Sequence, residues 1–172
     1  MEIQVERLIR SLEGTGRAIP SLIAAVSDED ARWKPADGAW SILEIVSHLA
    51  DEEVDDFRAR VRSTLDNPQT EWLPIDPEGW AREKDYNAGD LGETVARFCR
   101  ERNASLEWLR GLNQPDWSHA YQHPKFGPIS AGDLLGSWIA HDCLHVRQLA
   151  KRLRQLANRN SGEFELSYAG DW

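Results

Sequence analysis

Apolar residues recur every three or four positions in four separate stretches of this chain, and that spacing constrains the fold more than any other feature. A period of 3.6 residues gathers such residues on one face of an α-helix, and this face must be buried against another element. The stretches follow Val5, Ile42, Leu91 and Leu134. No alternating run of comparable strength predicts a strand, and no repeat is visible. The pattern therefore predicts an all-α protein.

Two of the expected helices carry a signature for their first turn. Ser41 is followed three residues later by Glu44, and Ser130 is followed by Asp133. In such a capping box the serine hydroxyl and the carboxylate each accept a hydrogen bond from a backbone N–H that the helix leaves free. We therefore expect helices to begin directly after Ser41 and after Ser130.

The other two helices are expected to differ in regularity. The first should cover residues 5–26, but Gly14, Gly16 and Pro20 should bend or interrupt it. The third should begin near Leu91 and end at Gly111, close to the next proline.

A long connection separates the second and third helices. Residues 66–90 contain three prolines and two glycines, which predicts irregular structure, and the length is typical of a crossover. Four helices packed side by side are the economical arrangement, so we expect a four-helix bundle. A chain of 172 residues is about one domain long. Residues 1–172 are therefore predicted to be a single domain, with 158–172 as a loosely held tail.

Charge and composition exclude several classes of protein. The net charge of −9 repels nucleic-acid backbones, so no nucleic-acid partner is expected. No apolar run reaches the roughly 20 residues of a membrane span, and two cysteines cannot form a disulfide framework. The first residues are charged and amphipathic, unlike a secretory signal. A soluble, cytoplasmic protein is expected.

Three histidines are candidate metal ligands. His141 and His145 are four residues apart, which places their Cβ atoms about 5 to 6 Å apart on one face of a helix. Two such imidazoles can bind one transition metal ion. His48 would supply a third ligand if the fold brings its helix alongside. The spacing alone also fits ordinary histidines of an amphipathic helix, so both interpretations stay open.

Three stretches of the chain resemble the DinB-like superfamily of metal-binding four-helix bundles. They are WSILEIVSHLADEE at 40–53, HPKFGPISAGDLL at 123–135 and HDCLHVRQLAKRL at 141–153. The family pattern has one histidine early in helix two and an HxxxH pair in helix four. The resemblance covers nearly all of the chain before Asn158. It implies an up-down-down-up bundle with a divalent ion, zinc or nickel, held by His48, His141 and His145.

The resemblance also suggests an activity. Characterised relatives include transferases and an isomerase that use low-molecular-weight thiols, which implies a metal-dependent thiol S-transferase acting on a small-molecule substrate. Hydrolysis by metal-bound hydroxide is a variant of the same chemistry. A non-catalytic, stress-related module that binds a metal or a ligand is the alternative class. Because relatives often pair, a homodimer is implied as well.

Three further residues are candidates beside the metal ligands. Three nitrogen ligands leave an open coordination position, the pattern of catalytic sites. Trp138 and Gln148 fall near the last-helix histidines on a helical wheel, so they are candidate cofactor-binding residues; a core aromatic and a solvent-facing amide are the alternatives. Glu52 lies within about 40° of His48 on the same kind of wheel and is the candidate catalytic carboxylate. A solvated acidic face explains Glu52 equally well.

Other potential ligands are disfavoured. Cys143 points about 160° away from the last-helix histidines on the wheel, so it should be a packing residue. His119 and His123 repeat the four-residue spacing but lie between prolines with little helical periodicity. These two histidines are predicted to be loop residues near the mouth of the pocket.

Overall fold

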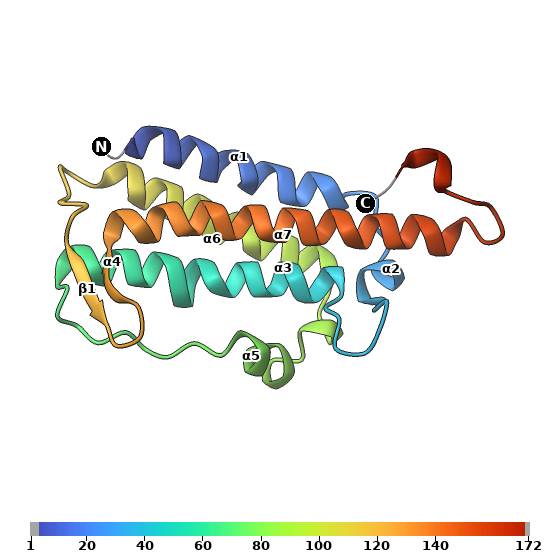
Figure 1. The fold of residues 1–172 in the computed structure, drawn as a ribbon, viewed down its shortest axis with the longest axis horizontal. Coiled ribbons are helices and arrows are strands. Elements are labelled where there is room, and N and C mark those ends of the chain that lie inside the picture. The colour runs from blue at the N-terminus through green and yellow to red at the C-terminus, as the bar shows by residue number, and fades with distance from the viewer. Residues whose placement is uncertain (1–3, 171–172) are drawn as a thin grey trace.

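A computed structural model of the protein describes residues 4–170. Four long helical segments lie side by side (Figure 1): α1 (Val5–Ile23); α3 (Ile42–Asp51) continued by a π-helical turn (Glu52–Phe57) and α4 (Arg58–Asp66); α6 (Leu91–Gly111); and α7 (Ala131–Asn160). The first and last segments run in one direction, and the second and third run in the opposite direction. This arrangement confirms the predicted up-down-down-up bundle.

The helix starts lie where the serine signatures predict them. Ser41 Oγ accepts a hydrogen bond from the Glu44 backbone N–H (3.1 Å), and Glu44 Oε2 accepts one from the Ser41 N–H (2.8 Å). Ser130 and Asp133 form the same pair at 3.0 and 2.9 Å. These caps fix where α3 and α7 begin and therefore which face carries each histidine.

The connection between α4 and α6 runs back along the whole bundle, as Figure 1 shows along its lower edge. It is less irregular than the proline content predicts, because it contains α5 (Pro77–Glu83) and a 3₁₀ turn (Tyr86–Ala88). Pro77 occupies the first turn of α5, where a missing N–H costs no helical hydrogen bond. The remaining short helices are α2 (Asp28–Arg32) and a 3₁₀ turn (Ser167–Ala169).

A small hairpin before α7 differs from the predicted loop. β1 (Ala120–His123) and β2 (Gly127–Ser130) pair antiparallel, with Tyr121 opposite Ile129. His123 is therefore the last residue of a strand. Neither strand sequence, AYQH or GPIS, alternates apolar and polar residues, so the sequence carries no strand signal here.

The first helix is also more regular than the sequence predicts. α1 is not interrupted, although Gly14, Gly16 and Pro20 all lie inside it. Gly16 has a packing role, because the side chain of Arg102 lies against α1 at this position. A Cβ atom on residue 16 would lie 2.8 Å from Cγ of Arg102.

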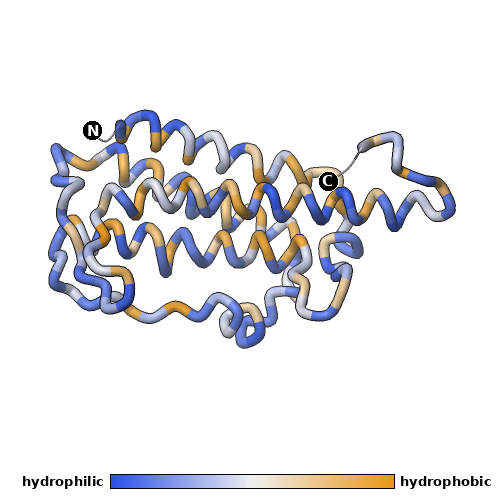
Figure 2. Tube along the Cα trace, in the orientation of Figure 1, coloured by the Kyte–Doolittle hydropathy of each residue, from blue (hydrophilic) through white to orange (hydrophobic). Residues whose placement is uncertain are grey.

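The apolar side chains of the bundle form two clusters, one towards each end. Each long segment contributes to both, and Figure 2 shows the apolar residues at intervals along every one of them. Polar residues separate the clusters on all four segments: Thr15, Glu53, Arg102 and Asp142. The candidate histidines lie close to this polar layer. Among the described residues, no helix is long and apolar enough to cross a membrane.

Candidate metal centre

The fold brings the three candidate ligands together. His48 lies on α3, and His141 and His145 lie one turn apart on α7. Nε2 of His141 is 3.3 Å from Nε2 of His48 and 3.1 Å from Nε2 of His145. One potential ligand atom from each residue lies within 4.8 Å of the others. We call these three side chains the histidine ring.

The three imidazole side chains of the histidine ring are uncharged at physiological pH. Burial lowers the pKa of His48 and of His141 to about 3, and the neighbouring rings act in the same direction. Burial also lowers the pKa of His145. Neutral imidazole is the form that binds metal ions, so no proton has to be displaced from these ligands. Nδ1 of His141 and Nδ1 of His48 are buried without a hydrogen-bond partner among the described residues. The atoms that face one another are the three Nε2 atoms, and such a set of neutral nitrogen donors fits a divalent cation.

Gln148 orients one member of the ring. Nδ1 of His145 donates a hydrogen bond to Oε1 of Gln148 at 2.8 Å, which leaves Nε2 of that histidine without a proton and facing His141. The structure thus gives Gln148 a contact to a candidate ligand. Its predicted contact with a cofactor stays a prediction.

The π-helical turn positions the acidic residues beside the ring. A π turn contains one extra residue, so the helical wheel shifts after Asp51. As a result, the side chains of Glu52, Glu53 and Asp56 are all buried. Oε1 of Glu52 lies 3.6 Å from Nδ1 of His48, close to the ring but beyond hydrogen-bond distance. A helical wheel with constant spacing therefore does not identify Glu53 and Asp56 as buried residues of this region.

Glu52 retains its proton more strongly than an ordinary carboxyl group. Burial raises its pKa to about 9, and the contact with Asp56 and the negative charge of Asp56 add to the effect, whereas Arg60 opposes it. Arg60 forms an ion pair with Asp56 at 2.7 Å. In the absence of a metal ion, Glu52 is therefore a neutral acid at neutral pH. Its catalytic role stays a prediction.

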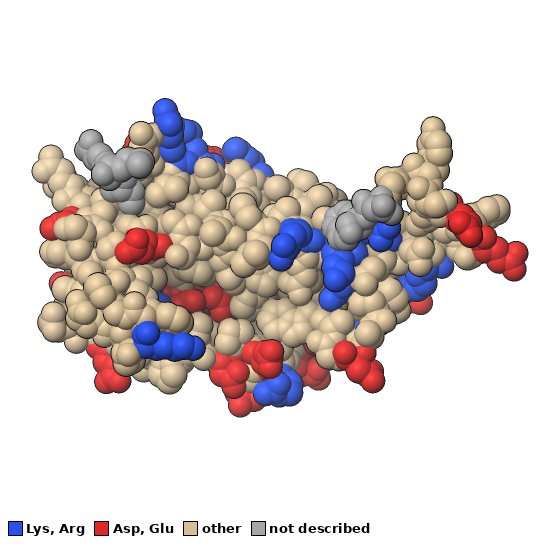
Figure 3. All heavy atoms as spheres, viewed as in Figure 1, with Lys and Arg blue, Asp and Glu red and all other residues tan. Residues whose placement is uncertain are grey.

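A cleft of about 580 Å³ opens onto the ring. It is lined by Trp40, His48, Glu52, Asp56, Phe57, residues 75–78 of the crossover and His141. Figure 3 shows acidic atoms in a hollow between α7 and the crossover on this face of the molecule. A small molecule in the cleft would reach two of the three candidate ligands directly.

A buried carboxylate anchors the crossover that forms one wall of the cleft. Asp51 is fully buried and accepts hydrogen bonds from Lys84 (2.5 Å), from the hydroxyl of Tyr86 and from Arg97. Two of these donors belong to the crossover and the third to α6. The sequence pattern contains no signal that joins residues so far apart.

Trp138 lies behind the ring. It is 1% exposed and stacks on Phe57, with ring centroids 5.5 Å apart, and Phe57 in turn contacts His141. Its indole N–H donates to Oε1 of Glu53 at 3.0 Å. This is the position of a core aromatic, the alternative considered above for Trp138.

A buried ionic triad crosses the polar layer next to the ring. Arg102 donates to Glu53 at 2.6 Å and to Asp142 at 2.8 Å, and all three residues are buried. Arg102 also donates to the backbone carbonyl of Leu12 at 2.8 Å, so the triad joins all four helical segments. Asp142 is adjacent in sequence to His141, which ties the triad to the ring. Charged residues usually indicate solvated faces, so the sequence pattern does not reveal this triad.

Cys143, His119 and His123 lie outside the histidine ring. Cys143 is not among the candidate ligands, as the wheel predicts, but it is exposed, so its predicted role as a packing residue is wrong. His119 contacts the carbonyl of Leu65 through Nδ1 (3.1 Å), and His123 accepts hydrogen bonds from the hairpin turn.

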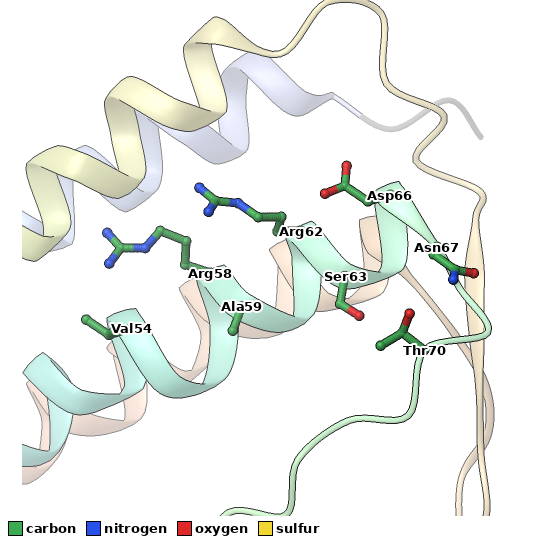
Figure 4. A pocket seen from close by; sticks show the side chains of 8 residues that line it. All are labelled: Val54, Arg58, Ala59, Arg62, Ser63, Asp66, Asn67 and Thr70. Carbon is green, nitrogen blue, oxygen red and sulfur yellow. The ribbon is translucent and has the colours of Figure 1, made fainter.

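A separate hollow of about 500 Å³ lies along α4 (Figure 4). Arg58 and Arg62 extend from α4 into it towards α6. Arg58 is paired with Glu101 at 2.7 Å, and the guanidinium of Arg62 lies over the ring of Trp108. No histidine lines this hollow, so it is not part of the metal centre.

Two curated bacterial relatives resemble the chain over most of its length. A protein of Oceanobacillus iheyensis named "Putative metal-dependent hydrolase OB0782" is 27% identical over 155 residues, which cover 87% of this chain and 88% of that protein. YfiT of Bacillus subtilis has the same description and is 22% identical, over 89% of this chain and 86% of YfiT.

A structural match and a family model agree with these two sequence matches. The solved structure of YfiT, described as "a probable metal-dependent hydrolase with an unusual four-helix bundle topology", matches with a TM-score of 0.80 at 21% identity, over 91% of this chain and 90% of YfiT. At this identity the structural likeness shows the fold alone. The family model of the DinB superfamily matches residues 11–149, which is most of the chain. This protein therefore belongs to the DinB superfamily.

Proposed function

We propose that the protein is a metal-dependent enzyme of the low-molecular-weight-thiol S-transferase type, with a divalent ion held by His48, His141 and His145. The observation that supports this most is the convergence of one buried and two half-buried imidazoles, of which His48 and His141 line an open cleft. Catalytic zinc sites have three protein ligands and an open position, whereas structural sites usually have four. Imidazole suits zinc and nickel, which are the ions we propose.

When bound, such an ion lowers the pKa of a thiol or a water at its remaining position and so supplies a nucleophile at neutral pH. The chain's own residues then have two tasks. Gln148 holds His145 in the orientation that a ligand needs. Glu52 lies at the cleft beside His48 and is proposed to exchange a proton with the reacting molecule.

Hydrolysis is the second candidate function. It would use the same histidines and Glu52, with water in place of the thiol. The relatives described as metal-dependent hydrolases favour this candidate. A non-catalytic module, in contrast, would retain its ligand without turnover.

The first experiment is elemental analysis of the protein, purified without an affinity tag or added metal. We expect close to one equivalent of zinc or nickel in the wild type and little in His48→Ala or His141→Ala. His123→Ala is the matched control, since it removes an imidazole outside the ring. Equal metal content in all four proteins would exclude the histidine ring as the binding site.

The second experiment separates the activities. The metal-loaded protein is assayed with several bacterial thiols and electrophilic acceptors, and in parallel with ester substrates without a thiol. Turnover that requires a thiol and is lost in His145→Ala supports the transferase. Ester turnover without a thiol supports the hydrolase, and no turnover above the His145→Ala background in either assay supports the non-catalytic module. Circular dichroism of each variant checks that the bundle remains folded.

A further inference from the structure

A second hollow of about 580 Å³ adjoins the histidine ring on the α7 side. Its lining residues all belong to α7: Leu144, His145, Arg147, Gln148, Lys151 and Arg152. It shares His145 and Gln148 with the metal centre. Figure 3 shows basic atoms gathered over the C-terminal half of α7, on the same face as the acidic hollow. A molecule bound at the ring can therefore reach a basic surface without crossing the protein.

Arg152 is the most informative residue of this hollow. Its side chain is only 7% exposed, yet no carboxylate of residues 4–170 pairs with it. Nε donates to the carbonyl of Trp40 at 2.6 Å and Nη1 donates to Gln155 at 2.7 Å, which fixes the guanidinium in place. Nη2 has no hydrogen-bond partner in the described part of the chain. Nη2 is not a buried atom, so it faces the open side of the hollow, where an anion can approach it.

Arg147 and Lys151 add two further positive charges. They are exposed and one helical turn apart, a spacing at which like charges destabilise a helix. Neither forms an ion pair or a hydrogen bond with a residue between 4 and 170. The chain has 29 acidic residues against 20 basic ones, so its sequence does not lack carboxylates that could pair with a cation. Three cations without an acidic partner among the described residues give this hollow a positive potential, which favours an anionic ligand.

We propose that Arg147, Lys151 and Arg152 bind an anionic oxygen group, a carboxylate or a phosphate, of the small molecule that reacts at the histidine ring. Arginine presents its N–H groups in a planar fork that matches either group. At 1.5 Å per residue, Lys151 and Arg152 lie about 10 Å along the helix from His145. This separation suits a small acid that carries its reactive group at the opposite end. The inference rests on the proposed function for the reaction, but anion binding itself needs no turnover.

The test is a titration of the zinc-loaded full chain with succinate and, separately, with inorganic phosphate. Backbone amide signals of residues 144–152 are followed by NMR. We expect saturable shifts in at least one titration, and the tighter ligand identifies the group as a carboxylate or a phosphate. The double variant Arg147→Gln/Lys151→Gln should weaken binding about tenfold, because two charge-assisted contacts are lost. Arg62→Gln is the matched control and should bind as the wild type does.

Two results would overturn the anion site: no saturable shift with either anion, or equal affinity in the wild type and the double variant. The latter would indicate that the anion binds the zinc directly, and binding would then disappear in His145→Ala but not in the double variant. Saturable binding that needs Arg147 and Lys151, without any thiol or ester turnover, would contradict only the proposed function. Turnover without anion binding would contradict only the site proposed here.

Discussion

His145 and Gln148 form a hydrogen bond of 2.8 Å between Nδ1 of the His145 imidazole and Oε1 of the Gln148 amide. The two residues are three positions apart on α7, so this contact is local to one helix and does not depend on how the bundle packs. It directs Nε2 of His145 towards His141, 3.1 Å away. One of the three candidate ligands is therefore oriented before any ion binds.

We predict that Gln148→Ala weakens zinc binding about tenfold, since residues that orient metal-bound histidines typically contribute 10- to 100-fold to affinity. Competition with a chelator of known affinity measures the change. Gln122→Ala, at an exposed position of β1, is the control and should bind zinc as the wild type does. Unchanged affinity in Gln148→Ala would show that the amide does not orient the ligand.

A second prediction concerns Glu52 in the metal-free protein. Its pKa is about 9 in the folded state against 4.5 as the ordinary value, so between these pH values the folded protein keeps a proton that the unfolded chain releases. The contribution of Glu52 to stability is therefore present below pH 4.5 and is lost as the pH rises towards 9. Glu52→Gln stays neutral at every pH. Relative to the wild type, the variant should gain roughly 1 kcal/mol or more between pH 4.5 and pH 8.

Urea denaturation of both metal-free proteins at the two pH values measures this gain. Glu107→Gln, which replaces an exposed carboxylate on α6, serves as the control and should show the same difference from the wild type at both values. A Glu52→Gln variant that behaves like this control would mean that Glu52 ionises normally.

The third prediction concerns the ionic triad. Replacing Arg102 with leucine leaves the carboxylates of Glu53 and Asp142 buried without their cation. Breaking a buried ion pair in this way costs about 3 to 5 kcal/mol. Arg110→Leu is the control, because it removes an exposed pair with Glu13 that is worth about 1 kcal/mol or less. Equal free energies of unfolding for the two variants would contradict the importance of the triad.

Much of the fold could be predicted because the decisive signals are local. The capping boxes at Ser41 and Ser130 and the end of α6 at Gly111 each involve residues within one helical turn. The spacing of His141 and His145 is local in the same way. Placing His48 beside them required the direction of each helix, which came from the family resemblance rather than from the spacing.

The features that could not be predicted depend on distant contacts. The extra residue of the π turn shifts the helical wheel after Asp51, so the acidic residues that face the ring could not all be identified. Glu53, Arg102 and Asp142 have the pattern of surface charges, and only the assembled bundle shows that they neutralise one another.

The last prediction uses two glycines of α1 as a matched pair. Gly14 has no neighbouring atom within 4 Å of an added Cβ, so Gly14→Ala should stabilise the protein by about 0.5 to 1 kcal/mol through helix propensity alone. Gly16→Ala gains the same propensity, but its Cβ would lie 2.8 Å from Cγ of Arg102. The guanidinium of Arg102 is held by two carboxylates and cannot move aside without losing them, so we expect a net loss of about 1 to 3 kcal/mol. Urea denaturation of the two variants decides the point: if both are stabilised alike, Arg102 is free to move and the triad does not hold α1 against the rest of the bundle.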